Sequence, residues 1–109
     1  MDYSSILQQV SCFWDSQAQP ALERFVSRKS LSPGFDAKWR ENGVLLQVCR
    51  EAAAFGEKHF HEANFSVLQD EGRSPSLFFS IEPTDRFREN SENTVFFYGH
   101  LDKQPEASG

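Results

Sequence analysis

The chain has 109 residues, of which 39% are hydrophobic and 25% are charged, with a formal net charge of −5. This length allows one small domain and excludes two. The apolar content, which includes 11 phenylalanines, is too high for a disordered chain, and the apolar runs are too short for a membrane span. The acidic balance argues against nucleic acid, which needs clustered lysine and arginine. We therefore expect a globular protein that binds neither nucleic acid nor a membrane.

Apolar residues recur at three- and four-residue steps from residue 4 to about residue 28, which predicts a helical unit with one apolar stripe. Pro20 interrupts this unit because it removes an amide donor and clashes with the preceding turn. Two alternatives stay open: two helices that meet near residues 17–19, or one helix that is kinked there. A turn cluster at residues 30–34 (SLSPG) then ends the unit.

A second helix is predicted over residues 37–60, with Asp36 as its N-cap. Gly43 and Gly56 weaken this helix locally, by about 1 kcal/mol each relative to alanine. The pattern after residue 64 changes to period two, with β-branched and aromatic residues, and this change predicts strands.

Three strands are predicted, at residues 65–67, 77–81 and 95–98, with polar, turn-forming segments between them. The last two are continuous apolar runs, which are typical of strands covered on both faces, so helices should lie on both sides of the sheet. The two helical units could cover only part of such a sheet. The predicted fold class is therefore α/β: the N-terminal part of a layered domain, with two helical units followed by about three strands, and incomplete.

His100 and Asp102 follow directly after the third predicted strand. Residues two apart in an extended segment point to the same face, so both side chains should project past the carboxyl end of that strand, where open α/β sheets place their sites. Imidazole is a common zinc ligand, and a neighbouring carboxylate orients the ring. We interpret His100 as a candidate metal ligand and Asp102 as its orienting partner. The competing interpretation is a surface turn with a solvated histidine and aspartate.

The other histidines, His59 and His61, fall at the end of the second predicted helix. They are interpreted as surface residues, because residues two apart on a helix do not share a face. Three glutamates are interpreted as solvated charges on a helix face, because no partner motif lies beside them: Glu51, Glu57 and Glu62.

Residues 95–106 (VFFYGHLDKQPE) resemble the first metal-binding motif of the co-catalytic zinc exopeptidases, a family that includes carnosinase, related dipeptidases, glutamate carboxypeptidase, aminoacylase and succinyl-diaminopimelate desuccinylase. The GHLDKQPE tail is particularly similar to the dipeptidase branch. Residues 25–36 (FVSRKSLSPGFD), together with Trp39 and the Asn42-Gly43 pair, are also similar to dipeptidases of this group. The likeness therefore spans most of the chain.

This resemblance implies that residues 1–109 are the N-terminal portion of a single metallopeptidase catalytic domain with a layered α/β zinc-peptidase fold. It implies that His100 ligates one of two bridged zinc ions, with manganese or cobalt as alternative metals, and that Asp102 is the catalytic-site residue that holds this histidine in place. The bridging aspartate, the glutamate pair that contains the general base, and the further ligands have no matching position in this chain. The chain alone is therefore expected to be inactive.

Two functions stay open at this point. The first is the N-terminal part of a zinc-dependent, dipeptidase-like hydrolase, whose substrate is a small peptide and whose relatives are often homodimers. The second is a truncated or non-catalytic binding module, in which a partner covers an open sheet edge. The start of the chain, MDYSS, lacks the basic and apolar regions of a secretory signal, so a cytoplasmic location is expected. Cys12 and Cys49 are expected to be buried thiols.

Overall fold

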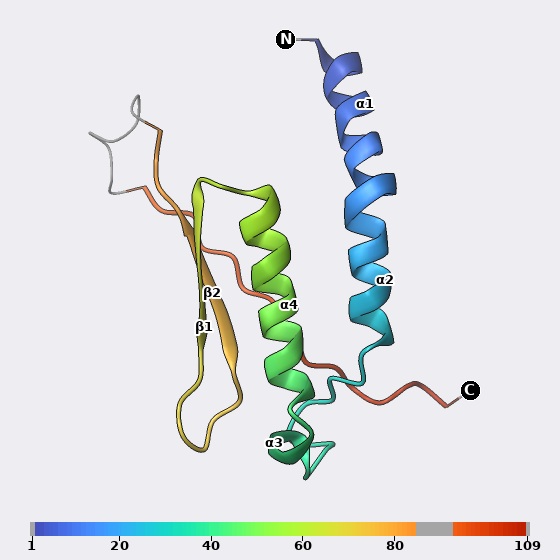
Figure 1. Cartoon of the computed structure of the whole chain (residues 1–109), viewed down its shortest axis with the longest axis vertical. Coiled ribbons are helices and arrows are strands. Elements are labelled where there is room, and N and C mark those ends of the chain that lie inside the picture. Colours follow the sequence, from blue (N-terminus) through green and yellow to red (C-terminus); the bar gives the residue numbers. More distant parts are fainter. Residues whose placement is uncertain (1, 85–92, 109) are drawn as a thin grey trace.

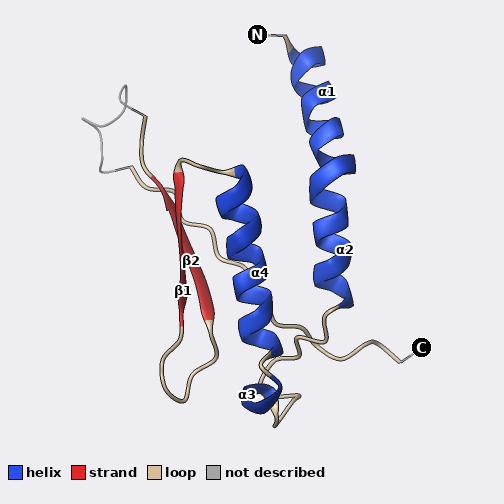
Figure 2. Ribbon diagram, viewed as in Figure 1, coloured by secondary structure: helices blue, strands red, loops and turns tan. Residues whose placement is uncertain are grey.

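The structure is a computed structural model that describes residues 2–84 and 93–108. A two-stranded antiparallel hairpin, a central helix and a long helical unit stand beside one another, with the central helix in the middle (Figures 1 and 2). This mixture of helix and small sheet is a partial α/β fold. The elements follow in chain order: α1 (Tyr3–Phe13), η1 (Trp14–Ala18), α2 (Gln19–Ser27), α3 (Trp39–Asn42), α4 (Val44–His59), β1 (Ala63–Leu68) and β2 (Ser76–Ile81).

The long helical unit is one continuous helix made of α1, η1 and α2. It begins where the Asp2 carboxylate accepts a hydrogen bond from the Ser4 amide at 3.1 Å. The η1 segment is a π-helical turn, in which the amide of Gln19 donates to the carbonyl of Trp14 five residues earlier. Pro20 then lies in the first turn of α2. The interruption expected here is confirmed, and it takes the form of one helix with a widened turn rather than two separate helices.

The second predicted helix, expected to begin after Asp36, begins later in the structure. Gly43 has a left-handed backbone (φ 69°), which separates the short α3 from α4. The Asp36 carboxylate stabilises the turn before α3, where it accepts a hydrogen bond from the Asn42 side chain at 2.7 Å. The Asn42 side chain in turn accepts from the Val44 amide at 3.0 Å, so that it starts α4. The prediction of one helix over residues 37–60 is therefore wrong in its first part.

The core lies between α4 and the hairpin, and it is small. Among the described residues, the buried apolar ones come from one face of α4: Leu45, Val48, Cys49 and Ala53. Gly56 is also buried, and a Cβ atom built on it would lie 2.3 Å from the ring of Phe65 in β1. That ring stacks on Phe79 of β2 at a centroid distance of 5.5 Å. Gly56 therefore sets how closely the hairpin approaches the helix.

The third predicted strand, residues 95–98, is not a strand. In the register of the hairpin Phe65 pairs with Phe79, and no residue of 95–98 is paired with β1 or β2. The four side chains of this segment are 77–81% exposed. An apolar, β-branched and aromatic run favours extended backbone, but a strand also needs a hydrogen-bonding neighbour, and none lies beside this segment in the part of the chain that the structure describes.

Within the described residues a helix covers only one face of the sheet, and helices on both faces stay a prediction. Helix α4 packs on the hairpin, whereas α1 and α2 lie on the far side of α4 (Figure 1). Large side chains of β2 are accordingly half exposed, including Phe78 at 52% and Ile81 at 62%. Helix α4 thus lies between the hairpin and the long helical unit, so both helical units are on the same side of the sheet (Figure 1).

Aromatic contacts at one end and an ion pair at the other tie the long helical unit to α4. The ring of Phe13 lies near those of Phe55 and His59, with centroid distances of 6.3 and 5.2 Å, and near that of Phe60, just after α4, at 6.5 Å. At the other end the Arg28 guanidinium forms a two-pronged ion pair with Glu51, with N–O distances of 2.8 and 3.2 Å. The hydrogen bond from Arg28 lowers the pKa of Glu51, because it stabilises the ionised form of this carboxylate.

Much of the apolar stripe on the long helical unit stays exposed. Its exposed members include Leu7, Val10 and Val26, at 68%, 60% and 64%. Cys12 is also exposed, whereas Cys49 is buried in the core, so the expectation of two buried thiols is wrong for Cys12. Among the described residues no helix combines the length and the apolar character that a membrane crossing requires.

Candidate functional site

His100 and Asp102 contact each other as the sequence spacing suggested. The Nδ1 atom of His100 lies 3.0 Å from Oδ1 of Asp102. An ionised carboxylate can only accept a hydrogen bond, so Nδ1 is the donor in this contact. A neutral ring in this arrangement keeps its lone pair on Nε2. The Tyr98 ring packs edge-on against the imidazole at a centroid distance of 5.2 Å. The arrangement is that of an oriented imidazole with one nitrogen available to a ligand.

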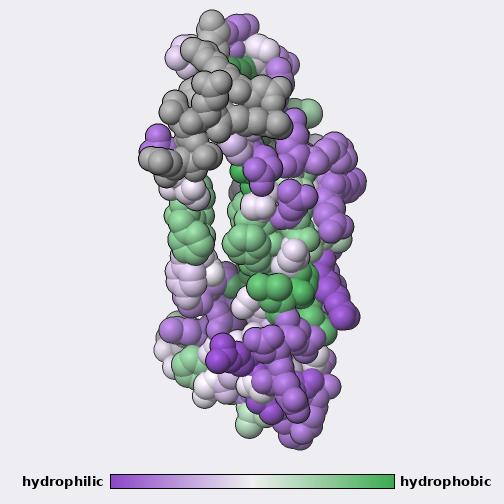
Figure 3. Space-filling view, turned by 90° about the vertical axis from the view of Figure 1, so that its left-hand side faces the viewer, coloured by the Kyte–Doolittle hydropathy of each residue, from purple (hydrophilic) through white to green (hydrophobic). Residues whose placement is uncertain are grey.

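The pair lines an open cleft between the hairpin and the end of the chain. The cleft has a volume of about 710 Å³, and three segments line it: part of α4 (Leu45, Val48, Cys49), the strand β2, and residues 94–102. The side of the molecule that carries the hairpin is hollowed in Figure 3, with apolar (green) surface on both sides of the gap. The His100 side chain is 66% exposed and that of Asp102 is 34% exposed. Both are therefore accessible to a small ligand.

An isolated parallel β-bridge between Leu31 and Lys103 fixes the backbone next to Asp102. The amide of Lys103 donates to the carbonyl of Ser30 at 2.8 Å, and the amide of Ser32 donates to the carbonyl of Lys103 at 2.9 Å. The Ser30 hydroxyl donates to the carbonyl of Leu101 at 3.1 Å, and Ser30 is completely buried. Residues on both sides of Asp102 are thus held by the turn segment that follows α2.

The Lys103 side chain adds a second anchor. Its Nζ atom donates to the carbonyls of Phe25, Val26 and Arg28 at 2.5, 3.1 and 2.6 Å. The sequence identified neither Ser30 nor Lys103 as part of the site. The partners lie more than 70 residues apart along the chain, and no local pattern in a single sequence announces such a pairing.

The other two histidines and Glu51 lie outside the His100–Asp102 pair. The His59 ring lies between Phe55 and Phe13, at centroid distances of 4.5 and 5.2 Å, while His61 is exposed in the turn before β1. Glu51 is occupied by Arg28. No cluster of three or more His, Cys, Asp or Glu side chains able to hold a metal ion occurs within residues 2–84 and 93–108.

The pair fits one ligand position of a metal site and does not complete one. An available Nε2 atom, with Nδ1 donating to a carboxylate, is the geometry that metal-ligating histidines adopt. A zinc site takes three or four protein ligands, and two-metal sites take more. Among the described residues, His100 could supply one such ligand and Asp102 the carboxylate that orients it.

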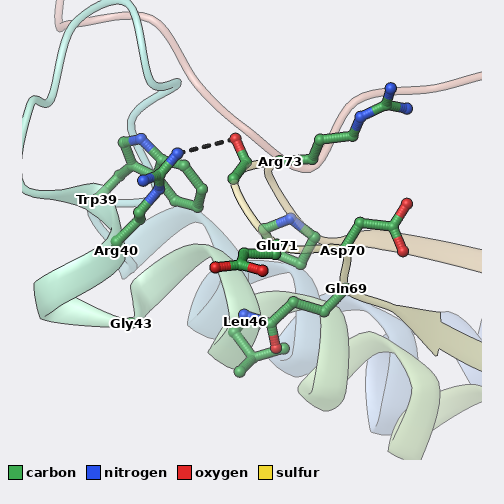
Figure 4. A pocket seen from close by; sticks show the side chains of 10 residues that line it. Trp39, Arg40, Gly43, Leu46, Gln69, Asp70, Glu71 and Arg73 are labelled. Carbon is green, nitrogen blue, oxygen red and sulfur yellow. Dashed lines mark hydrogen bonds between the residues drawn. The ribbon is translucent and has the colours of Figure 1, made fainter.

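A smaller hollow of about 370 Å³ lies between α3 and the loop that joins β1 to β2. In Figure 4 the Arg40 side chain lies over the Trp39 ring and reaches the loop. Its guanidinium carbon is 4.9 Å from the ring centroid, and its Nη2 atom donates to the carbonyl of Gly72 at 2.8 Å. This arginine therefore fastens the hairpin loop to α3.

Comparison with known proteins leaves the family open. The chain matches no protein-family model, and no curated protein matches it significantly. The metallopeptidase hypothesis therefore depends on the residues of the chain itself and on their geometry.

Proposed function

We propose that this chain is the N-terminal part of a zinc-dependent metallopeptidase, of the dipeptidase-like type, that hydrolyses amide bonds of small peptides. The observation that carries the proposal is the contact between His100 Nδ1 and Asp102 Oδ1 at 3.0 Å, which leaves Nε2 free at the rim of a cleft. The sequence around the pair, GHLDKQPE, adds to it, because it resembles the first metal-binding motif of that family.

In this proposal His100 offers Nε2 to a metal ion, and Asp102 holds the ring in the tautomer that keeps this nitrogen unprotonated. Bound zinc, or manganese or cobalt in its place, polarises a scissile carbonyl and lowers the pKa of a water molecule. The general base and the other ligands have no counterpart in this chain. The 109-residue chain by itself is therefore proposed to be inactive.

A second candidate is a non-catalytic binding module whose partner covers the open sheet. The observation in its favour is the unpaired run at residues 95–98, which is 77–81% exposed and lines the same open cleft as β2. Exposed apolar surface next to an open strand edge is typical of a protein-binding or self-associating region.

A zinc titration of the ¹⁵N-labelled chain tests the ligand assignment. We expect the His100 ring nitrogens to be the first imidazole signals to respond, with weak binding, because a single histidine does not make a tight site. His100→Ala should remove the response, and His61→Ala, which changes an exposed histidine outside the cleft, should leave it intact. A first response at His59 or His61 would contradict the assignment. Tight, stoichiometric zinc binding would contradict the claim that the ligand set is incomplete.

A further inference from the structure

The Lys103 side chain closes the C-terminal end of α2. The last carbonyls of a helix have no partner within the helix and carry the negative end of its dipole, so they favour a cation. The Lys103 ammonium group donates to three carbonyls at this end of the helix, those of Phe25, Val26 and Arg28, and lies 4.3 Å from the centroid of the Phe25 ring. The Phe25 carbonyl also accepts a hydrogen bond from the Arg28 amide at 3.1 Å. All three donor positions of the ammonium group are thus used.

This lysine is next to the candidate ligand pair in sequence but turns away from it. His100 and Asp102 line the cleft, while the side chain one residue further on reaches back to α2. The backbone of Lys103 is bridged to Ser30 and Ser32 at the same time. The residue is therefore held by its backbone and by its side chain, directly beside Asp102.

We propose that Lys103 is the positioning residue of the site: its ammonium group docks the His100–Asp102 segment onto the end of α2 and so fixes the orientation of the imidazole. The role of the oriented imidazole as a metal ligand rests on the proposed function, whereas its positioning by Lys103 does not. Lys103 acts through Asp102 and touches no reacting group. Burial lowers the pKa of Lys103, and the three carbonyls compensate the loss of water around its charge.

The test compares variants of the 109-residue chain by the ¹⁵N shifts of the His100 ring. In the native chain we expect the neutral ring to be protonated on Nδ1. Lys103→Met keeps the aliphatic stem over Phe25 but removes the charge and the donors, and should shift the ring toward the Nε2-protonated form that free histidine prefers. Lys103→Arg, which keeps the charge and donors, should restore much of the native form. Lys29→Met is the matched control, because Lys29 is exposed and the substitution removes the same charge.

Amide hydrogen exchange supplies a second readout. The Ser32 and Lys103 amides, which form the bridge, should exchange at least about tenfold faster in Lys103→Met than in Lys29→Met, while amides of the hairpin should not change. An unchanged His100 tautomer together with unchanged exchange in Lys103→Met would overturn the proposal. A purely structural contribution would lower the overall stability without moving the tautomer, and that result would overturn it as well.

If Lys103→Met does not fold, an NMR measurement on the native chain still tests whether the Lys103 ammonium group is docked. An ammonium group held by three carbonyls exchanges its protons slowly enough to give a ¹⁵Nζ signal with its attached protons, and a freely solvated one does not. A persistent Lys103 signal supports the proposal, and its absence overturns it. A zinc titration without response at His100 would remove the metallopeptidase function but leave these results standing, so the two failures are distinguishable.

Discussion

Replacing His100 by alanine is expected to reduce peptide hydrolysis and zinc binding by the full-length native protein by more than about 100-fold. Loss of a group that merely orients a metal ligand costs about 10- to 100-fold in metal affinity or activity, and loss of the ligand itself should cost more. Because the His100 side chain is 66% exposed, the same substitution should leave the fold intact. The measurements are the steady-state hydrolysis of dipeptides and the bound zinc per chain.

Two further variants sharpen this prediction. Asp102→Asn keeps the size of the side chain but allows its amide to donate, so the ring is no longer held with Nδ1 protonated; we expect a loss of about 10- to 100-fold. His61→Ala is the control and should retain normal turnover. Near-normal turnover in His100→Ala, with normal zinc content, would show that His100 is not a ligand.

Gly56→Val is expected to destabilise the chain by about 3 kcal/mol, the upper part of the range for overpacking a core. A Cβ atom at this position would lie 2.3 Å from two atoms of the Phe65 ring, and that ring is itself stacked on Phe79 at 5.5 Å. Valine is a better helix former than glycine by only about 0.5 kcal/mol, so the gain within α4 offsets little of the clash. The free energy of unfolding from urea titration measures the effect.

Ala54→Val is the matched control for Gly56→Val. It places the same side chain in the same helix at an exposed position, and should cost only the difference in helix propensity, about 0.5 kcal/mol. Shortening the facing ring with Phe65→Leu in the Gly56→Val background should recover part of the loss, which a double-mutant cycle detects as coupling. Equal effects of Gly56→Val and Ala54→Val would mean that the hairpin does not pack closely on Gly56.

Features that depend on neighbouring residues could be predicted from the sequence. The helical spacing before Pro20 predicts the long helical unit, and its interruption occurs as a π-helical turn within one helix. The period-two pattern predicts β1 and β2. The spacing of His100 and Asp102 predicts that their side chains share one face, because residues two apart in an extended segment do so. The two side chains do meet, at 3.0 Å, although the backbone bends at residues 101 and 102.

Features that depend on distant residues could not be predicted in this way. Residues 95–98 have the composition of a strand, but pairing needs a second strand beside them, and composition says nothing about that neighbour. Aspartate is a good N-cap, so the sequence predicts a helix that begins directly after Asp36. In the structure Gly43 has a positive φ, and the long helix begins only at Val44. The anchoring of Lys103 on α2 joins residues 75 or more positions apart, beyond any local pattern.

The central proposal is that His100 and Asp102 belong to the first part of a two-metal hydrolase whose remaining ligands lie outside these 109 residues. Native mass spectrometry of the protein isolated from its own cell tests this most directly, because one spectrum gives both the chain mass and the bound metal. The claim predicts a chain several times heavier than the 12.5 kDa of these residues, with two zinc ions that are lost on chelation. A chain near 12.5 kDa without metal would contradict it, and would favour the binding module with a partner on its open sheet.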